Sequence, residues 1–86
     1  MSQILIAEDE SMLRAIAVEM LEDAGFSVYQ AGDGEEALAL LKSHPGIQVL
    51  VSDIKMPRMD GYALAEAGIK LRPELKILLM TGYAQE

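Results

Sequence analysis

Residues 47–61 read IQVLVSDIKMPRMDG. The stretch opens with a largely apolar run, residues 47–51, of the kind found in strands that are buried on both faces of a sheet. The run stops at Asp53, and the residues after it, which include Pro57 and Gly61, indicate a loop. A buried strand that ends at an acid and a loop is typical of an open parallel sheet, where ligands bind beyond the carboxyl ends of the strands.

The same alternation of strand and helix extends to both sides of this stretch. Apolar runs at residues 4–7, 26–29 and 75–80 predict three further strands, and the alternation within 26–29 places that strand at a sheet edge. Apolar residues recur at helical spacing between the strands. The positions predicted to face inward are Leu13, Ile16, Ala17, Met20, Leu21 and Ala24 in the first helix, Ala37, Leu38 and Leu41 in the second, and Leu64, Ala67 and Leu71 in the third.

Polar residues and glycine mark the ends of these helices. Ser11 or its acidic neighbours are expected to cap the first helix, and Gly25 to end it. Asp33 and Glu36 have the spacing of a capping box, and Asp60 is expected to cap the third helix. Strands that alternate with helices predict an α/β fold with a parallel sheet and right-handed crossovers.

Composition narrows the class of protein. The 86 residues suffice for one domain, and 14 acids against seven Lys and Arg give a net charge of -7. That charge argues against nucleic-acid binding by this segment and suits cations or basic partner surfaces. There are no cysteines, which excludes disulfides and thiol chemistry. The apolar runs fall far short of the ~20 residues that cross a bilayer, and no signal peptide is evident, so a cytoplasmic location without membrane attachment is expected.

Oxygen-bearing side chains follow three of the four predicted strands. Glu8 and Asp9 follow the first, Asp53 ends the third, and Thr81 follows the fourth. If the first and third strands are neighbours, the three carboxylates converge on one pocket and repel each other. Mg²⁺, which takes oxygen ligands and commonly pairs with phosphate, would offset that repulsion. Thr81 would then be well placed to bond a phosphoryl oxygen.

Each of these residues also has a plainer interpretation. Acids such as Glu8 and Asp9 often only cap a helix, Asp53 can cap a turn toward Pro57, and Lys55 alone is typical of a solvated loop charge. The metal site is favoured because several oxygen-bearing side chains coincide at successive strand ends, where this fold builds its sites.

Three segments resemble the receiver domains of bacterial two-component response regulators. They are residues 4–10, ILIAEDE, residues 51–61, VSDIKMPRMDG, and residues 79–84, LMTGYA. The resemblance implies that Asp53 is the phosphoacceptor and that Mg²⁺ is held by Asp9 directly, by Glu8 through water, by Asp53, and by the backbone carbonyl of Lys55. It implies that Thr81 bonds the phosphoryl group as a switch residue. Lys55 and Tyr83 occupy positions that tune dephosphorylation in this family.

The resemblance also implies a fold. Receiver domains are flavodoxin-like three-layer α/β proteins of strand order 2-1-3-4-5, for which the chemotaxis receiver CheY is the usual example. Residues 1–86 are expected to form a single, incomplete receiver domain of (βα)₃β pattern and strand order 2-1-3-4. The family's fourth helix, fifth strand and fifth helix have no counterpart in this sequence. No lysine follows Lys76 to take the place of the family's fifth-strand lysine, which implies that phosphorylation is slow or absent.

Three functions follow from the sequence. The first is a switch that accepts a phosphoryl group from a histidine kinase or phosphotransfer protein, rather than a turnover enzyme. The second is a phosphorylation-independent interaction or dimerisation module, or a fragment of a longer regulator. The third, an aspartyl-phosphate phosphatase, is disfavoured because Lys55 stands where a second acid is needed. The fourth strand, residues 77–80, has the composition of an interior strand, so self-association through it is expected.

Overall fold

The computed structural model describes residues 2–80, and four strands and three helices alternate along this part of the chain. Thr81 and Tyr83, two residues of the predicted site region, lie outside it. The elements in chain order are β1 (Gln3–Ala7), α1 (Ser11–Asp23), β2 (Ser27–Ala31), α2 (Gly34–Ser43), β3 (Ile47–Asp53), α3 (Gly61–Leu71) and β4 (Lys76–Met80).

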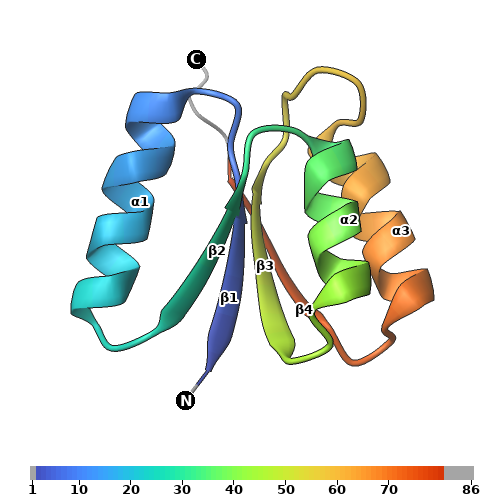
Figure 1. Cartoon of the computed structure of the whole chain (residues 1–86). Coiled ribbons are helices and arrows are strands. Elements are labelled where there is room, and N and C mark those ends of the chain that lie inside the picture. The colour runs from blue at the N-terminus through green and yellow to red at the C-terminus, as the bar shows by residue number, and fades with distance from the viewer. Residues whose placement is uncertain (1, 81–86) are drawn as a thin grey trace.

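The four strands form one parallel sheet in the order β2-β1-β3-β4, as predicted. α1 covers one face of the sheet, and α2 and α3 lie side by side on the other (Figure 1). These three layers follow from right-handed crossovers, which carry successive helices to opposite faces once the strand order reverses. The reversal lies between β1 and β3, so the carboxyl ends of these two strands are adjacent.

The face covered by α2 and α3 holds the larger core. Leu5 and Leu50 from the two central strands are fully buried there, and so are Leu41 from α2 and Leu64 from α3. The inward positions predicted for α2 are confirmed, since Ala37 and Leu41 are buried and Leu38 packs against the same core. Burial of these branched side chains makes this face the larger contributor of apolar burial to the stability of the fold.

The prediction for α1 is largely wrong. Ala17 and Leu21 pack against the sheet, but Leu13, Ile16 and Met20 are 44%, 50% and 66% exposed, and Ala24 is exposed as well. The predicted stripe is wider than the surface that one helix can bury on this face. α3 shows the same effect at its end, where Leu64 is buried, Ala67 half-buried and Leu71 exposed. Within residues 2–80, α1 is the only helix on its face of the sheet (Figure 1).

The expected caps are mostly present. The Asp33 carboxylate accepts a hydrogen bond from the backbone N–H of Glu36 (2.8 Å), and the Asp60 carboxylate accepts one from that of Ala63 (2.8 Å). The Glu36 carboxylate accepts a hydrogen bond from the N–H of Gly32 (2.8 Å). In the predicted capping box this bond would come from the N–H of Asp33, one residue later. α1 differs, because Glu10 is its N-cap and makes no side-chain capping bond. The second strand begins at Ser27 and ends at Ala31, two residues beyond the predicted end.

The cap at Asp33 should make stability depend on pH. The N–H of Glu36 lowers the pKa of this carboxyl, burial opposes the shift, and Arg58 lowers it further. A depressed pKa contributes stability that is present above the ordinary aspartate pKa of ~3.9 and is lost as the pH falls through the folded-state value. We expect Asp33→Asn to be less stable than wild type at neutral pH, with the two converging in acid. Urea melts at several pH values would measure this, and a gap that stays constant in acid would contradict it.

No helix within residues 2–80 combines the length and the apolar composition needed to cross a membrane.

Candidate functional site

The carboxylates are brought together by the register of the central strands. Ala7 at the end of β1 pairs with Ser52 of β3, so the residues that follow them, Glu8 and Asp53, lie side by side at the carboxyl edge of the sheet. Asp53 in turn pairs with Met80 at the end of β4. This edge is the top of the sheet in Figure 1. The predicted convergence of the first and third strand ends is therefore confirmed.

Glu8, Asp9 and Asp53 form one compact cluster. Each offers a carboxylate oxygen, and these three oxygens all lie within 4.8 Å of one another. Glu8 and Asp53 are buried, while Asp9 is exposed. Glu8 Oε2 accepts a hydrogen bond from the N–H of Glu10 (3.1 Å), and Asp53 Oδ1 accepts one from the N–H of Ile54 (2.9 Å). Backbone groups thus orient both buried carboxylates.

The cluster is electrostatically unfavourable without a cation. Burial raises the pKa of Glu8, and the neighbouring charges of Asp53 and Asp9 raise it further, against the opposing effect of the Glu10 N–H. The three carboxylates supply hard oxygen donors of the kind that bind Mg²⁺, which also keeps several waters. The exposure of Asp9 leaves one side of the cluster open to water and to a phosphate group. The donor set therefore fits a hard divalent cation.

The loop after Asp53 is tied to the sheet and to α3. The N–H of Ile54 bonds to the carbonyl of Met80 (3.1 Å), and the N–H of Gly61 bonds to the carbonyl of Ile54 (2.7 Å). Gly61 packs so closely that an added Cβ would lie 2.4 Å from the Asp53 carbonyl oxygen. Ser52 Oγ also donates to that carbonyl (2.9 Å). The backbone of Asp53 is therefore fixed from two sides.

The far part of this loop is fastened to α2. Arg58 Nη1 lies 2.6 Å from Asp33 Oδ2, and a Cβ on Gly34 would lie 2.4 Å from the carbonyl oxygen of Met59. Arg58 has a positive φ of 71°, a left-handed conformation that costs L-residues roughly 1–2 kcal/mol. The ion pair and the packing of Met59 hold the loop in this conformation.

The strain at Arg58 gives a prediction with its own control. Arg58→Ala and Arg58→Gly both remove the guanidinium, but only glycine accepts the positive φ at low cost. We expect Arg58→Gly to be about 1 kcal/mol more stable than Arg58→Ala, as measured by chemical denaturation. Equal stability of the two variants would show that the left-handed conformation is not retained in solution.

The remaining predicted residues have mixed outcomes. Lys55 is exposed and, with Asp9 and Asp60, lines a hollow of about 530 Å³ beside the cluster. Tyr62, which is 61% exposed, lines the same hollow and was not anticipated, because a tyrosine one residue into a helix has no distinctive sequence signal. Ser52 was missed as a support of Asp53, and Gly61 was predicted only as a residue of the loop. Glycine after an N-cap aspartate was the available signal for Gly61.

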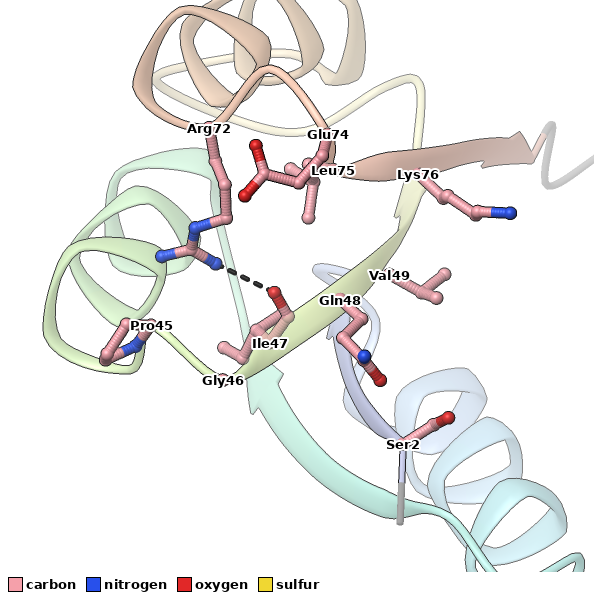
Figure 2. Close-up of a pocket in the computed structure, with 10 residues that line it drawn as sticks. All are labelled: Ser2, Pro45, Gly46, Ile47, Gln48, Val49, Arg72, Glu74, Leu75 and Lys76. Carbon is pink, nitrogen blue, oxygen red and sulfur yellow. Dashed lines mark hydrogen bonds between the residues drawn. The ribbon is translucent and has the colours of Figure 1, made fainter.

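A second hollow lies away from the carboxylates. It has about 560 Å³ and opens at the amino ends of β3 and β4, between Gly46, Arg72 and Lys76 (Figure 2). Arg72 donates to the carbonyl of Ile47 (2.8 Å) and to that of Leu41. This side chain links the end of α3 to the last turn of α2 and to the start of β3. In an open α/β sheet ligands bind at the opposite edge, so this hollow is not the candidate site.

The parallel sheet and the acidic cluster at the carboxyl ends of its central strands define an α/β protein whose candidate site lies where the strand order reverses. The family model for the response regulator receiver domain matches residues 4–86, and the chain belongs to this family. The chain is 40% identical to the response regulator receiver protein CpdR of Brucella abortus (strain 2308), over 98% of this chain and 69% of that protein. It is 36% identical to the sensor kinase CckA of the same organism, over 96% of this chain and 9% of CckA.

Solved structures agree with this assignment. The response regulator protein TrrA from Thermotoga maritima, in complex with Mg(2+)-BeF, superposes with a TM-score of 0.91 at 33% identity, covering 98% of this chain and 72% of that one. The CheX-CheY-BeF3-Mg+2 complex from Borrelia burgdorferi gives a TM-score of 0.90 at 26% identity, over 99% and 65% of the two chains. The predicted family and flavodoxin-like fold are confirmed.

Proposed function

We propose that this chain is a phosphoacceptor switch of two-component signalling, in which Asp53 accepts a phosphoryl group. Mg²⁺ would be held by Asp9 and Asp53, by Glu8 through water, and by the backbone carbonyl of Lys55. The observation that supports this most strongly is the cluster of three carboxylate oxygens within 4.8 Å, two of them on buried residues. Burying repelling carboxylates costs stability, and a bound divalent cation offsets that cost.

The proposed reaction transfers a phosphoryl group from a histidine nitrogen to a carboxylate oxygen of Asp53. A carboxylate oxygen of Asp53 attacks the phosphorus of a phosphohistidine on a histidine kinase or phosphotransfer protein. The P–N bond breaks, and the imidazole leaves after taking up a proton. Bound Mg²⁺ would neutralise charge on the phosphoryl oxygens. The bonds from Ile54, Gly61 and Ser52 keep the nucleophile in position, and Thr81 would donate its hydroxyl to the phosphoryl group.

Further parts of this proposal concern the whole chain. Residues 1–86 act as one receiver unit, in the cytoplasm, where histidine kinases present their phosphorylated domains. The unit is a switch and not a turnover enzyme, because its own aspartate is the acceptor. Partners are a sensor kinase or phosphotransfer protein, and the acidic charge of -7 makes nucleic acid an unsuitable partner for this segment.

The proposal is tested by NMR with Mg²⁺ and then beryllofluoride, which mimics a phosphoryl group on a carboxylate. We expect Mg²⁺ to shift the amides of Glu10 and Ile54, and beryllofluoride to shift the Asp53 loop further. Asp53→Asn should show neither response, and Glu66→Gln, which removes an exposed acid from α3, should show both. A wild-type protein that binds Mg²⁺ without any beryllofluoride response would contradict phosphoryl acceptance.

Self-association is a second candidate role, favoured by one feature of β4. Within residues 2–80 this strand lies at an edge of the sheet, and Leu78 on it is 58% exposed. An apolar edge strand pairs readily with another, and lysine on such an edge prevents pairing.

We expect wild type to form a concentration-dependent dimer and Leu78→Lys to be monomeric in sedimentation experiments. Leu71→Lys, at an exposed leucine on α3, should behave as wild type. A monomeric wild-type protein at all concentrations would rule out this role.

A further inference from the structure

Arg14 connects α1 to the ends of both β1 and β2. Its Nη1 donates to the carbonyl of Glu8 (2.7 Å), and its Nε donates to Oε1 of Gln30 on β2 (3.2 Å). The side chain is half-buried. It therefore bonds the main chain of a residue whose carboxylate belongs to the acidic cluster.

The bonds around Arg14 fix the whole segment from Glu8 to Glu10. The N–H of Glu8 bonds to the carbonyl of Ala31 (3.0 Å), and the N–H of Arg14 bonds to that of Glu10 (2.9 Å). Glu10 caps α1 without a side-chain bond. The Glu8 carboxylate accepts from the N–H of Glu10, and the guanidinium donates to the Glu8 carbonyl, so both the side chain and the main chain of Glu8 are held at this helix start.

The site leaves room for this side chain at Gly32. A Cβ there would lie 3.3 Å from Arg14 Nη1, a tight contact that would push against the guanidinium. Glycine after β2 therefore allows Arg14 to lie between the two strand ends.

The charge of Arg14 is placed without blocking the cluster. Among residues 2–80, no ion pair within 4.0 Å joins Arg14 to Glu8, Asp9 or Asp53. The guanidinium bonds the main-chain carbonyl of Glu8 and not its carboxylate. The oxygens of the three acids remain available to a metal ion.

We propose that Arg14 is a positioning residue for the metal site, holding Glu8 and Asp9 in the geometry that lets them share one divalent cation with Asp53. The inference rests on the proposed Mg²⁺ site and adds a residue that touches neither metal nor phosphoryl group. Partners that orient metal ligands typically account for 10–100-fold in affinity, which gives the size of the effect.

The test is Mg²⁺ affinity, measured by NMR titration beside a urea melt of each variant. Arg14→Gln should bind Mg²⁺ about tenfold more weakly than wild type while remaining folded. Arg14→Lys keeps the charge but cannot bond Glu8 and Gln30 together, so it should recover part of the loss. Lys42→Gln, the same charge change on exposed α2, should leave Mg²⁺ affinity unchanged. If the role of Arg14 were purely structural, Arg14→Gln would unfold at a lower urea concentration, but its folded form would bind Mg²⁺ as tightly as wild type.

The outcomes separate this inference from the proposed function. Wild type and Arg14→Gln binding Mg²⁺ equally would overturn the role of Arg14 and leave the metal site standing. Failure of wild type to bind would overturn the site and this inference with it. Should Arg14→Gln not fold, Gln30→Ala removes one of the two side-chain bonds and keeps the charge. Weakened Mg²⁺ binding by Gln30→Ala would then support the inference, and unchanged binding would overturn it.

Discussion

Asp53→Asn is expected to lower Mg²⁺ affinity by at least ~100-fold while making the metal-free protein more stable. Replacing a residue that only orients a metal ligand typically weakens metal binding 10–100-fold. The loss expected here is at least as large as the upper end of that range, because Asp53 is itself a proposed ligand. The gain in stability follows from the cluster, in which the charge of Asp53 raises the pKa of buried Glu8. Removing that charge relieves a repulsion, and the amide can still accept the bond from Ile54.

Calorimetric titration with Mg²⁺ and urea melts without metal would measure both effects. Glu66→Gln serves as the control, since it removes one exposed acid far from the cluster and should change neither quantity. An Asp53→Asn protein that is less stable than wild type without metal would show that the three carboxylates do not repel one another as the structure implies.

Gly61→Ala is expected to lower the free energy of unfolding by about 3 kcal/mol and to weaken Mg²⁺ binding as well. The added Cβ would meet backbone atoms, the Asp53 carbonyl oxygen at 2.4 Å and the Ile54 Cα at 2.9 Å. These are main-chain atoms at the carboxyl end of a central strand, and they cannot move away from the added Cβ as a flexible side chain could. Overpacking of this kind lowers the free energy of unfolding by roughly 1–3 kcal/mol or slightly more. The displacement would reach Asp53 itself.

Gly68→Ala is the matched control in the same helix. Its Cβ would meet the flexible end of Leu75 at 3.1 Å, and alanine is favoured over glycine inside a helix by roughly 0.5–1 kcal/mol. We expect Gly68→Ala to remain within ~1 kcal/mol of wild type and to bind Mg²⁺ normally. Equal losses for the two variants would contradict the close approach at Gly61.

The strands and the acids at their ends were predictable from patterns that are local in sequence, whereas the strand order was predicted from the resemblance to receiver domains. Continuous apolar runs define β1 and β3, and acids placed directly after them must meet once the two strands are neighbours. Caps were predictable for the same reason, as Asp33 and Asp60 bond to N–H groups three residues on.

The supports of the site were not predictable in this way. Arg14 bonds to Glu8 and to Gln30, and Arg58 pairs with Asp33, across separations of up to 25 residues that no periodicity encodes. The exposure of Ile16 and Met20 also escaped prediction, because helical spacing reveals an apolar face but not how much of it a neighbour covers.

The most direct test of the account is to incubate the protein with phosphoramidate and Mg²⁺, then measure its intact mass and map the modified peptide. The account predicts a gain of one phosphoryl group, located on Asp53, removed by hydroxylamine as expected of an acyl phosphate, and absent in Asp53→Asn. No gain in mass, or a phosphoryl group on any other residue, would contradict the assignment of Asp53 as the phosphoacceptor.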